Sequence, residues 1–523
     1  MQGKPTIIGY TDQTWREVGA GEPDAVMRLV QADCTSASIK REVKVFQGLF
    51  RVSLFKSQIF IFTLVHTLTD IGRCTTRGVA AMDRCENTLQ GSRPCRMIPG
   101  LPDELSLSVL QQLANPAHSQ YVGLEVEEEW WSMSVLPALL ALSTVSRRLH
   151  AEVEPLLYQR FLGGADAISR RSFLRTVTNN SKLARHVKHL SWNGHNARWT
   201  VSESHCVPSR NPDIEVWIER LFNLPLSART RLRVYEGLFL EQASVEFFFL
   251  LLNLPEVTTL YHDSGNYTSG FYDVLAESIN QVDNCAKLKP LACLERAFVS
   301  QPTDLMFSCR EVMCCVRLPS LRSMTMLGNE RIFDPEPHFQ PSTSIKDLTI
   351  LKCDLNNASF DRLMQYFESL ESLHVESNSG DPELIGYLTA MEHCRESLCS
   401  FRFSMNKTVL SEPLNKGSLS ALRSFRDYPR LASMDVVDIA LGCMSSGAPP
   451  CLVSFLPPSI EQFTLTAWLY DQDVIQPMLE GLAQQKDRFP LLKIVRLRHP
   501  DWRDVHLIKD RFHEAGVDFN LEQ

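Results

Sequence analysis

The histidine and cysteine side chains that could do chemistry in this chain occur in small, scattered groups. His186 and His189 lie three residues apart, and His205 stands next to Cys206, so each group offers an imidazole that could act as a base or bind a metal. Surface and strand-edge histidines are more common than either, and no third group lies near to complete a site. We interpret these histidines as structural residues.

Motifs of nucleotide-binding and hydrolytic enzymes are missing from the sequence. It contains no GxGxxG, no Walker GxxxxGK[ST], no HExxH and no GxSxG. The adjacent Cys314 and Cys315 lack the nearby His or Cys that a zinc site needs, and we interpret the basic cluster Arg170, Arg171 and Arg175 as a solvated helix face. We therefore expect no catalytic residue, no metal and no cofactor. An enzyme with an unrecognised site is a less favoured alternative.

Composition narrows the range of partners. In the 523 residues, 44% are hydrophobic and 22% charged, as in folded soluble proteins, and the formal net charge is -8. That charge offers no global basic field for nucleic acid or an anionic membrane. The most apolar stretch, Ser57–Leu68, is shorter than the roughly 20 residues of a spanning helix. The 15 cysteines form no CxxC pair and suit a reducing compartment. We expect a cytoplasmic or nuclear protein that binds neither nucleic acid nor membrane.

Residues 1–97 show no period and no motif, and we expect either a poorly ordered region or a small domain there. Two helical stretches follow them. The first has Pro102 at a helix start, acids in the first turn and leucines at steps of three or four, in the string LPDELSLSVLQQL. The second continues that spacing from Leu136 onward in LPALLALSTVSRRLHAEVEPLLYQRF, where Pro155 is expected to kink or restart the helix. These patterns predict a compact helical module over residues 98–162.

This module resembles the F-box, especially in its filamentous-fungal form, through the opening LPxEL, the segment VSRRL and the closing LLY. The resemblance implies that apolar side chains dock on the adaptor subunit of an SCF-type ubiquitin ligase, and through it on a cullin. The residues in the family's docking positions are Leu101, Pro102, Leu105, Val109, Leu110, Leu142, Val145 and Leu149. The chain departs from the family by an insert at 114–135, which holds the acidic run Glu125–Glu129.

A repeat runs through the second half of the chain. Four successive units fit the leucine-rich-repeat template LxxLxLxx(N/C), and their starts are separated by about 24 to 28 residues. The template positions are Leu321, Met324, Met326 and Asn329; Ile345, Leu348, Ile350 and Cys353; Leu370, Leu373, Val375 and Asn378; and Leu398, Phe401, Phe403 and Asn406. Each unit pairs a short strand with a helix such as the one predicted from Phe360 to Leu370.

Weaker members of the repeat flank these four units. They include Val187 with Leu190, Val257 with Leu260, Leu291 with Leu294, Met434 with Val436, Phe463 with Leu465, and Val495 with Leu497. The predicted fold class is therefore α/β: an N-terminal helical F-box module, then an irregular leucine-rich-repeat solenoid over residues 180–520, with parallel strands inside and helices outside. An ordinary α/β domain with buried strands is the alternative.

Strand positions that alternate with the buried residues are the predicted surface for a target protein. We assign Arg322, Thr325, Lys346, Thr349, Glu371 and His374 to this surface. The resulting hypothesis is an interaction protein that recruits a target of unknown identity to a ubiquitin ligase. The alternative hypothesis is a repeat scaffold whose F-box no longer binds the adaptor.

Overall fold

The computed structural model describes residues 136–143, 147–163, 167–193, 213–240, 242–263, 269–281, 289–300, 315–327, 342–353, 357–377, 390–405, 425–438, 452–468, 472–499, 502 and 505–522. These residues belong to two compact units, of which one contains Pro137–His150 and the other contains the chain from Ala151 onward.

The described part of the predicted F-box module is helical. Helix α6 spans Leu136–Ser143 and helix α7 spans Arg147–Leu157, so Pro155 lies within α7 and does not restart it. Pro155 has no backbone N–H, so it removes one hydrogen bond near the C-terminal end of α7.

The structure describes only two of the predicted adaptor-binding residues. Leu149 is half-buried on α7, and Leu142 lies in α6. The others, Leu101, Pro102, Leu105, Val109, Leu110 and Val145, lie outside the described residues, as do residues 1–97 and the insert at 114–135.

The second unit contains one sheet of twelve parallel strands. Their order in the sheet is their order in the chain, because each strand pairs with the one before it and the one after it. The strands are β1 (Arg160–Gly163), β2 (His189–Asn193), β3 (Thr259–Asp263), β4 (Arg296–Ser300), β5 (Ser323–Leu327), β6 (Asp347–Cys353), β7 (Ser372–Ser377), β8 (Ser400–Met405), β9 (Ser433–Val437), β10 (Gln462–Thr466), β11 (Ile494–Arg498) and β12 (Asp518–Glu522).

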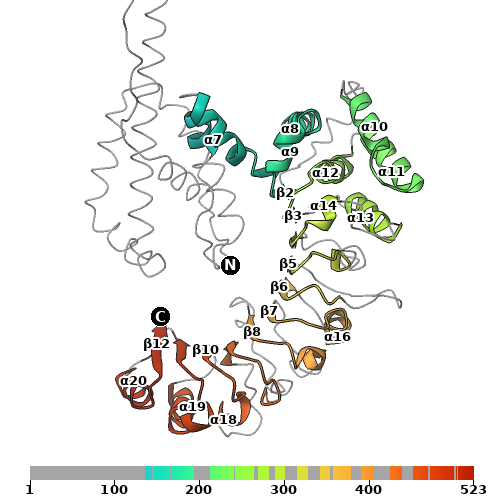
Figure 1. The fold of residues 1–523 in the computed structure, drawn as a ribbon. Helices are drawn as coiled ribbons and strands as arrows, with labels where there is room; N and C mark the ends of the chain where they lie inside the picture. The colour runs from blue at the N-terminus through green and yellow to red at the C-terminus, as the bar shows by residue number, and fades with distance from the viewer. Residues whose placement is uncertain are drawn as a thin grey trace, which may run out of the picture. The chain divides into compact units, whose positions relative to one another are not determined.

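Helices connect the strands and lie on one side of the sheet (Figure 1). They are α8 (Ala167–Asn179), α9 (Ser181–His186), α10 (Ile214–Phe222), α11 (Ala228–Phe239), α12 (Ala243–Leu252), α13 (Ser269–Gln281), α14 (Lys289–Ala292), α16 (Asn357–Met364), α18 (Leu452–Phe455), α19 (Gln472–Gln484) and α20 (Val505–Glu514), with 3-10 turns η4 (Met391–Cys394) and η7 (Lys486–Arg488). Sequential parallel pairing with helices on one side is the architecture of a leucine-rich-repeat-like solenoid, which confirms the α/β solenoid part of the prediction. None of the described helices is long and apolar enough to cross a membrane.

The helix-facing side of the sheet is an apolar row that continues through every strand. One side chain per strand aligns across the sheet, in the order Phe161, Leu190, Leu260, Ala297, Met324, Leu348, Leu373, Phe401, Met434, Phe463, Val495 and Phe519. All twelve are at most 8% exposed. Since a side chain at each step packs against its neighbours in the next repeat, the row forms one continuous core.

The sequence placed most of these strands correctly, with three kinds of error. Leu291 and Leu294 do not lie in a strand: Leu291 belongs to α14, and β4 begins at Arg296. The shift arises because the inward residue Ala297 is small and does not stand out as apolar. The helix predicted to run to Leu370 ends at Met364. The two edge strands, β1 and β12, were not predicted as repeat strands.

The basic cluster on α8 is not the solvated face that its composition suggests. Arg170 is 2% exposed and donates from Nε to Oε2 of Glu246 at 2.6 Å, while Arg171 donates to Oε1 of the same carboxylate at 2.9 Å. Glu246 is fully buried on α12, and the Arg170 guanidinium lies 5.1 Å from the centre of the Trp192 ring. Arg175 is exposed and pairs with Asp213. The cluster therefore fastens α8 to α12.

Candidate functional site

The face of the sheet opposite the helices is the candidate site, and we call it the open face. Its central row aligns residues Leu162, Ser191, Tyr261, Phe298, Thr325, Thr349, His374, Arg402, Asp435, Thr464, Arg496 and Asn520. Unlike the buried row, this row changes character from strand to strand. Most side chains on it lie outside the apolar core, so their types can vary to suit a partner.

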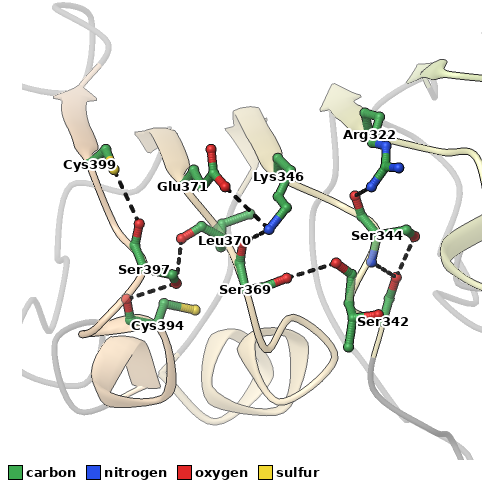
Figure 2. Close-up of polar contacts among 11 residues, drawn as sticks. Arg322, Ser342, Ser344, Lys346, Ser369, Leu370, Glu371, Cys394, Ser397 and Cys399 are labelled. Atoms are coloured by element: carbon green, nitrogen blue, oxygen red, sulfur yellow. Dashed lines mark hydrogen bonds and ion pairs between the residues drawn. The ribbon is translucent and has the colours of Figure 1, made fainter. Parts of the chain in front are cut away.

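The six predicted target-binding residues divide into two sets. Thr325, Thr349 and His374 are half-buried neighbours in the central row of the open face, as predicted. The other three, Arg322, Lys346 and Glu371, each precede their strand by one residue and line its N-terminal edge (Figure 2).

The edge residues contact one another and the backbone. Lys346 Nζ lies 3.2 Å from a carboxylate oxygen of Glu371 and donates to the carbonyl of Ser369 at 3.2 Å. Arg322 donates to the carbonyl of Ser344 at 3.2 Å. The alternation of buried and exposed residues in the sequence wrongly assigned Arg322, Lys346 and Glu371 to the open face. A residue just before a strand does not follow the two-residue period of that strand.

A ladder of serine hydroxyls supports this edge. In five repeats a serine lies three residues before the strand and donates to a carbonyl of the preceding repeat, as Ser397 does to Leu370 at 2.7 Å in Figure 2. The donors are Ser320, Ser344, Ser369, Ser397 and Ser459, with donor to acceptor distances from 2.7 to 3.4 Å. Each is followed by a buried Leu or Ile, so the motif Ser-(Leu/Ile)-x-x-apolar is a repeat signature that sequence reasoning missed.

The open face is aromatic and apolar at β3 to β6. Tyr261 and Phe298 stack with ring centres 4.6 Å apart and planes inclined by 20°. Thr325 continues the same row, and Leu327 and Leu351 lie beside it as half-buried neighbours in the next row. The centre of this part of the face offers dispersion and hydroxyl contacts, while the charged Arg296 on β4 and Asp347 on β6 lie at the N-terminal ends of their strands.

The open face is ionic at β8 to β12, where Arg402, Asp435, Arg498, Glu522 and Arg496 form a chain of alternating charge. Asp435 Oδ2 lies 3.4 Å from Arg402 Nε and 3.0 Å from Arg498 Nη1. Arg498 Nε donates to Glu522 at 2.8 Å, and Arg496 Nε lies 3.9 Å from the other oxygen of Glu522. The three arginine side chains are each about a third exposed. We call these five residues the ionic cluster.

No member of the ionic cluster was among the predicted target residues. The sequence nevertheless contains a signal for three of them. The residue between the two inward apolar residues of a repeat strand is Thr349 or His374 in the predicted set, and it is Arg402, Asp435 or Arg496 in the later repeats. Glu522 could not be found in this way, since β12 does not fit the template.

His374 lies between the two parts of the face. Its Nε2 is 3.5 Å from the Ser404 hydroxyl, and burial together with the neighbouring Arg402 charge lowers the pKa of His374 to about 4. The imidazole is therefore neutral at physiological pH. Asp347, on β6, has a pKa raised by burial and by the nearby Glu371 carboxylate.

Among the residues that the structure describes, no group of three or more His, Cys, Asp or Glu side chains is placed to hold a metal ion. A scan against protein-family models finds no match to the chain, and a search of curated proteins finds no similar one. The arrangement of the open face is therefore the basis for a functional assignment.

Proposed function

We propose that this protein is a substrate-recruiting subunit of an SCF-type ubiquitin ligase, in which the F-box module binds the adaptor and the open face binds a target protein. The observation that carries the proposal is the twelve-stranded parallel sheet, whose helix-facing row is uniformly apolar while its open face varies. A surface of this kind suits recognition of an extended protein partner. The ligase assignment rests on the F-box resemblance of the sequence.

The proposed contribution of the protein is geometry, not bond chemistry. Holding a target and the ligase on one chain raises the effective concentration of the target at the site of ubiquitin transfer. Ubiquitin transfer itself would be performed by other subunits. Target choice would then depend on the open face, and ligase choice on the helical module.

Adaptor binding is the direct test. The double variant Leu105→Ala/Val145→Ala removes two apolar anchors of the resemblance and should abolish co-purification of the purified adaptor with the full chain, because interface energy concentrates in a few buried side chains. Leu491→Ala/Leu507→Ala, which truncates two leucines that are 48% and 51% exposed on the solenoid, is the matched control and should bind normally. Absence of adaptor binding by the unaltered protein would refute the ligase assignment.

A repeat scaffold that binds its target without a ligase is the second candidate. Two observations favour it: the insert at 114–135 departs from the F-box pattern, and no family model matches the chain. This candidate predicts no adaptor binding but full target binding, so the co-purification experiment separates the two.

A further inference from the structure

The open face has an excess of positive charge over β8 to β11. On these four strands the positions that face this side carry Arg402, Asp435, Arg496 and Arg498 as their only charged side chains, for a formal net charge of +2. The strand between them, β10, contributes the buried and uncharged Thr464 and Thr466. The basic centre therefore stands out on a chain whose net charge is -8.

Acidic residues border this centre on both sides. Glu376 lies on β7, next to Ser404 of β8, and Asp518 lies on β12, next to Ile494 of β11. Glu522, also on β12, is already paired with Arg498. The border restricts the region of positive potential to the four strands between β7 and β12.

Arg496 has hydrogen-bonding capacity that its own chain does not use. Its side chain is 34% exposed, and its only contact with charge in the described part of the chain is the 3.9 Å ion pair with Glu522, which is too long for a hydrogen bond. A guanidinium has five N–H donors in a planar fork that matches a carboxylate. Arg496 is therefore positioned to receive an acidic group from outside.

The lowered pKa of His374 agrees with this distribution of charge. Burial is the main cause, and the Arg402 charge adds to it. A neutral imidazole adds no charge at the border between β7 and the ionic cluster.

We propose that the ionic cluster binds an acidic, carboxylate-bearing segment of the target protein. The inference rests on the proposed role of the open face in target binding, and it names the chemistry of the target. Incoming carboxylates would bind Arg496 and compete with Asp435 and Glu522 for Arg402 and Arg498. Because charge-assisted arginine to carboxylate pairs are stronger than neutral hydrogen bonds, such a segment can be held without an apolar pocket.

The register of the sheet sets the spacing of the acidic residues. Arg402 and Arg496 occupy the same row three strands apart, and neighbouring strands are separated by about 4.8 Å, so the two positions lie about 14 Å apart. An extended chain advances about 3.4 Å per residue and therefore places residues i and i+4 on one side at nearly the same separation. The preferred segment would cross the strands with acidic residues four apart.

Direct binding of a labelled decaglutamate peptide to the full chain tests this inference. Fluorescence anisotropy at about 50 mM salt, where surface charges are weakly screened, should show saturable binding that weakens as salt is raised. The double variant Arg402→Gln/Arg496→Gln should bind about tenfold more weakly. A decalysine peptide should not bind to this face, so any affinity it has for other, acidic parts of the chain should be the same in the double variant.

The matched control is Arg488→Gln/Lys509→Gln, which removes the same two charges from exposed positions on η7 and α20. It should retain the decaglutamate affinity within about twofold, since distant surface charges are screened. Equal losses in the two double variants would mean a general charge effect and would overturn the proposal, as would the absence of decaglutamate binding. Adaptor binding is a separate measurement, so failure of the ligase assignment leaves this result interpretable.

Discussion

Two arginine to carboxylate networks of this solenoid use the same chemistry in opposite surroundings. The network of Arg170, Arg171 and Glu246 lies on the helix side, where Glu246 is fully buried and Arg170 is 2% exposed. The ionic cluster lies on the open face, where its arginines are about a third exposed. Burial makes the first network obligatory for the fold, because a buried charge without a partner is costly. Partial exposure leaves the second available to a ligand.

The largest effect is expected in the buried network. Glu246→Gln keeps the shape of the side chain but leaves the Arg170 guanidinium buried without its counter-charge, which should lower the free energy of unfolding by about 3 to 5 kcal/mol. Urea denaturation followed by circular dichroism measures it.

Glu256→Gln is the control for that experiment. Glu256 pairs with Lys188 but is 46% exposed, so the same substitution there should cost less than about 1 kcal/mol. Similar losses in the two variants would show that burial does not separate structural from available carboxylates in this protein.

The next largest change in stability is expected when the buried row of β6 and β7 is compared with their open face. Leu373→Ala opens a cavity in the buried row and should cost roughly 2 to 5 kcal/mol. Thr349→Ala and His374→Ala, on the open face, should each change stability by less than about 0.5 kcal/mol while altering target binding. Thermal unfolding of the three variants decides the matter: comparable losses for Leu373 and Thr349 would reject the assigned register.

The difference between the faces also explains what the sequence could predict. Buried positions repeat the same apolar types at a fixed spacing, so Leu348, Leu373 and Phe401 were assigned to successive strands correctly. Where the inward residue is small, as at Ala297, the pattern fades and the strand was misplaced. The serine ladder carried a readable signature as well, but its role becomes clear only when the acceptor carbonyls of the preceding repeat are located.

The template position reveals Arg402, Asp435 and Arg496 as open-face residues, but the ion pairs of the ionic cluster could not be predicted, for a different reason. Its members are spread from residue 402 to residue 522, and only the register of five strands brings them together. The buried network has the same property, since Arg170 and Glu246 are 76 residues apart. Charged residues have no periodic pattern that would reveal such pairs, so composition suggested a solvated helix face for α8. A correct topology is needed before charges can be paired.

The last prediction concerns the centre of the ionic cluster, where a small loss of stability should be accompanied by a modest gain in binding. Asp435 is 20% exposed and shares its carboxylate between Arg402 and Arg498. Asp435→Asn should lower the free energy of unfolding by less than about 1 kcal/mol, because partly exposed pairs contribute little. The substitution also removes the carboxylate that competes with an incoming ligand, so decaglutamate should bind about two to five times more tightly.

Thermal unfolding and peptide anisotropy on the same preparation measure both effects of Asp435→Asn. A loss of several kcal/mol would make Asp435 a structural counterpart of Glu246 and would remove the distinction between the two networks. Weaker peptide binding at unchanged stability would show instead that Asp435 orients the arginines for their ligand. Tighter binding at nearly unchanged stability is the result that the exposure of the ionic cluster predicts, because ligand and Asp435 then compete for the same guanidinium groups.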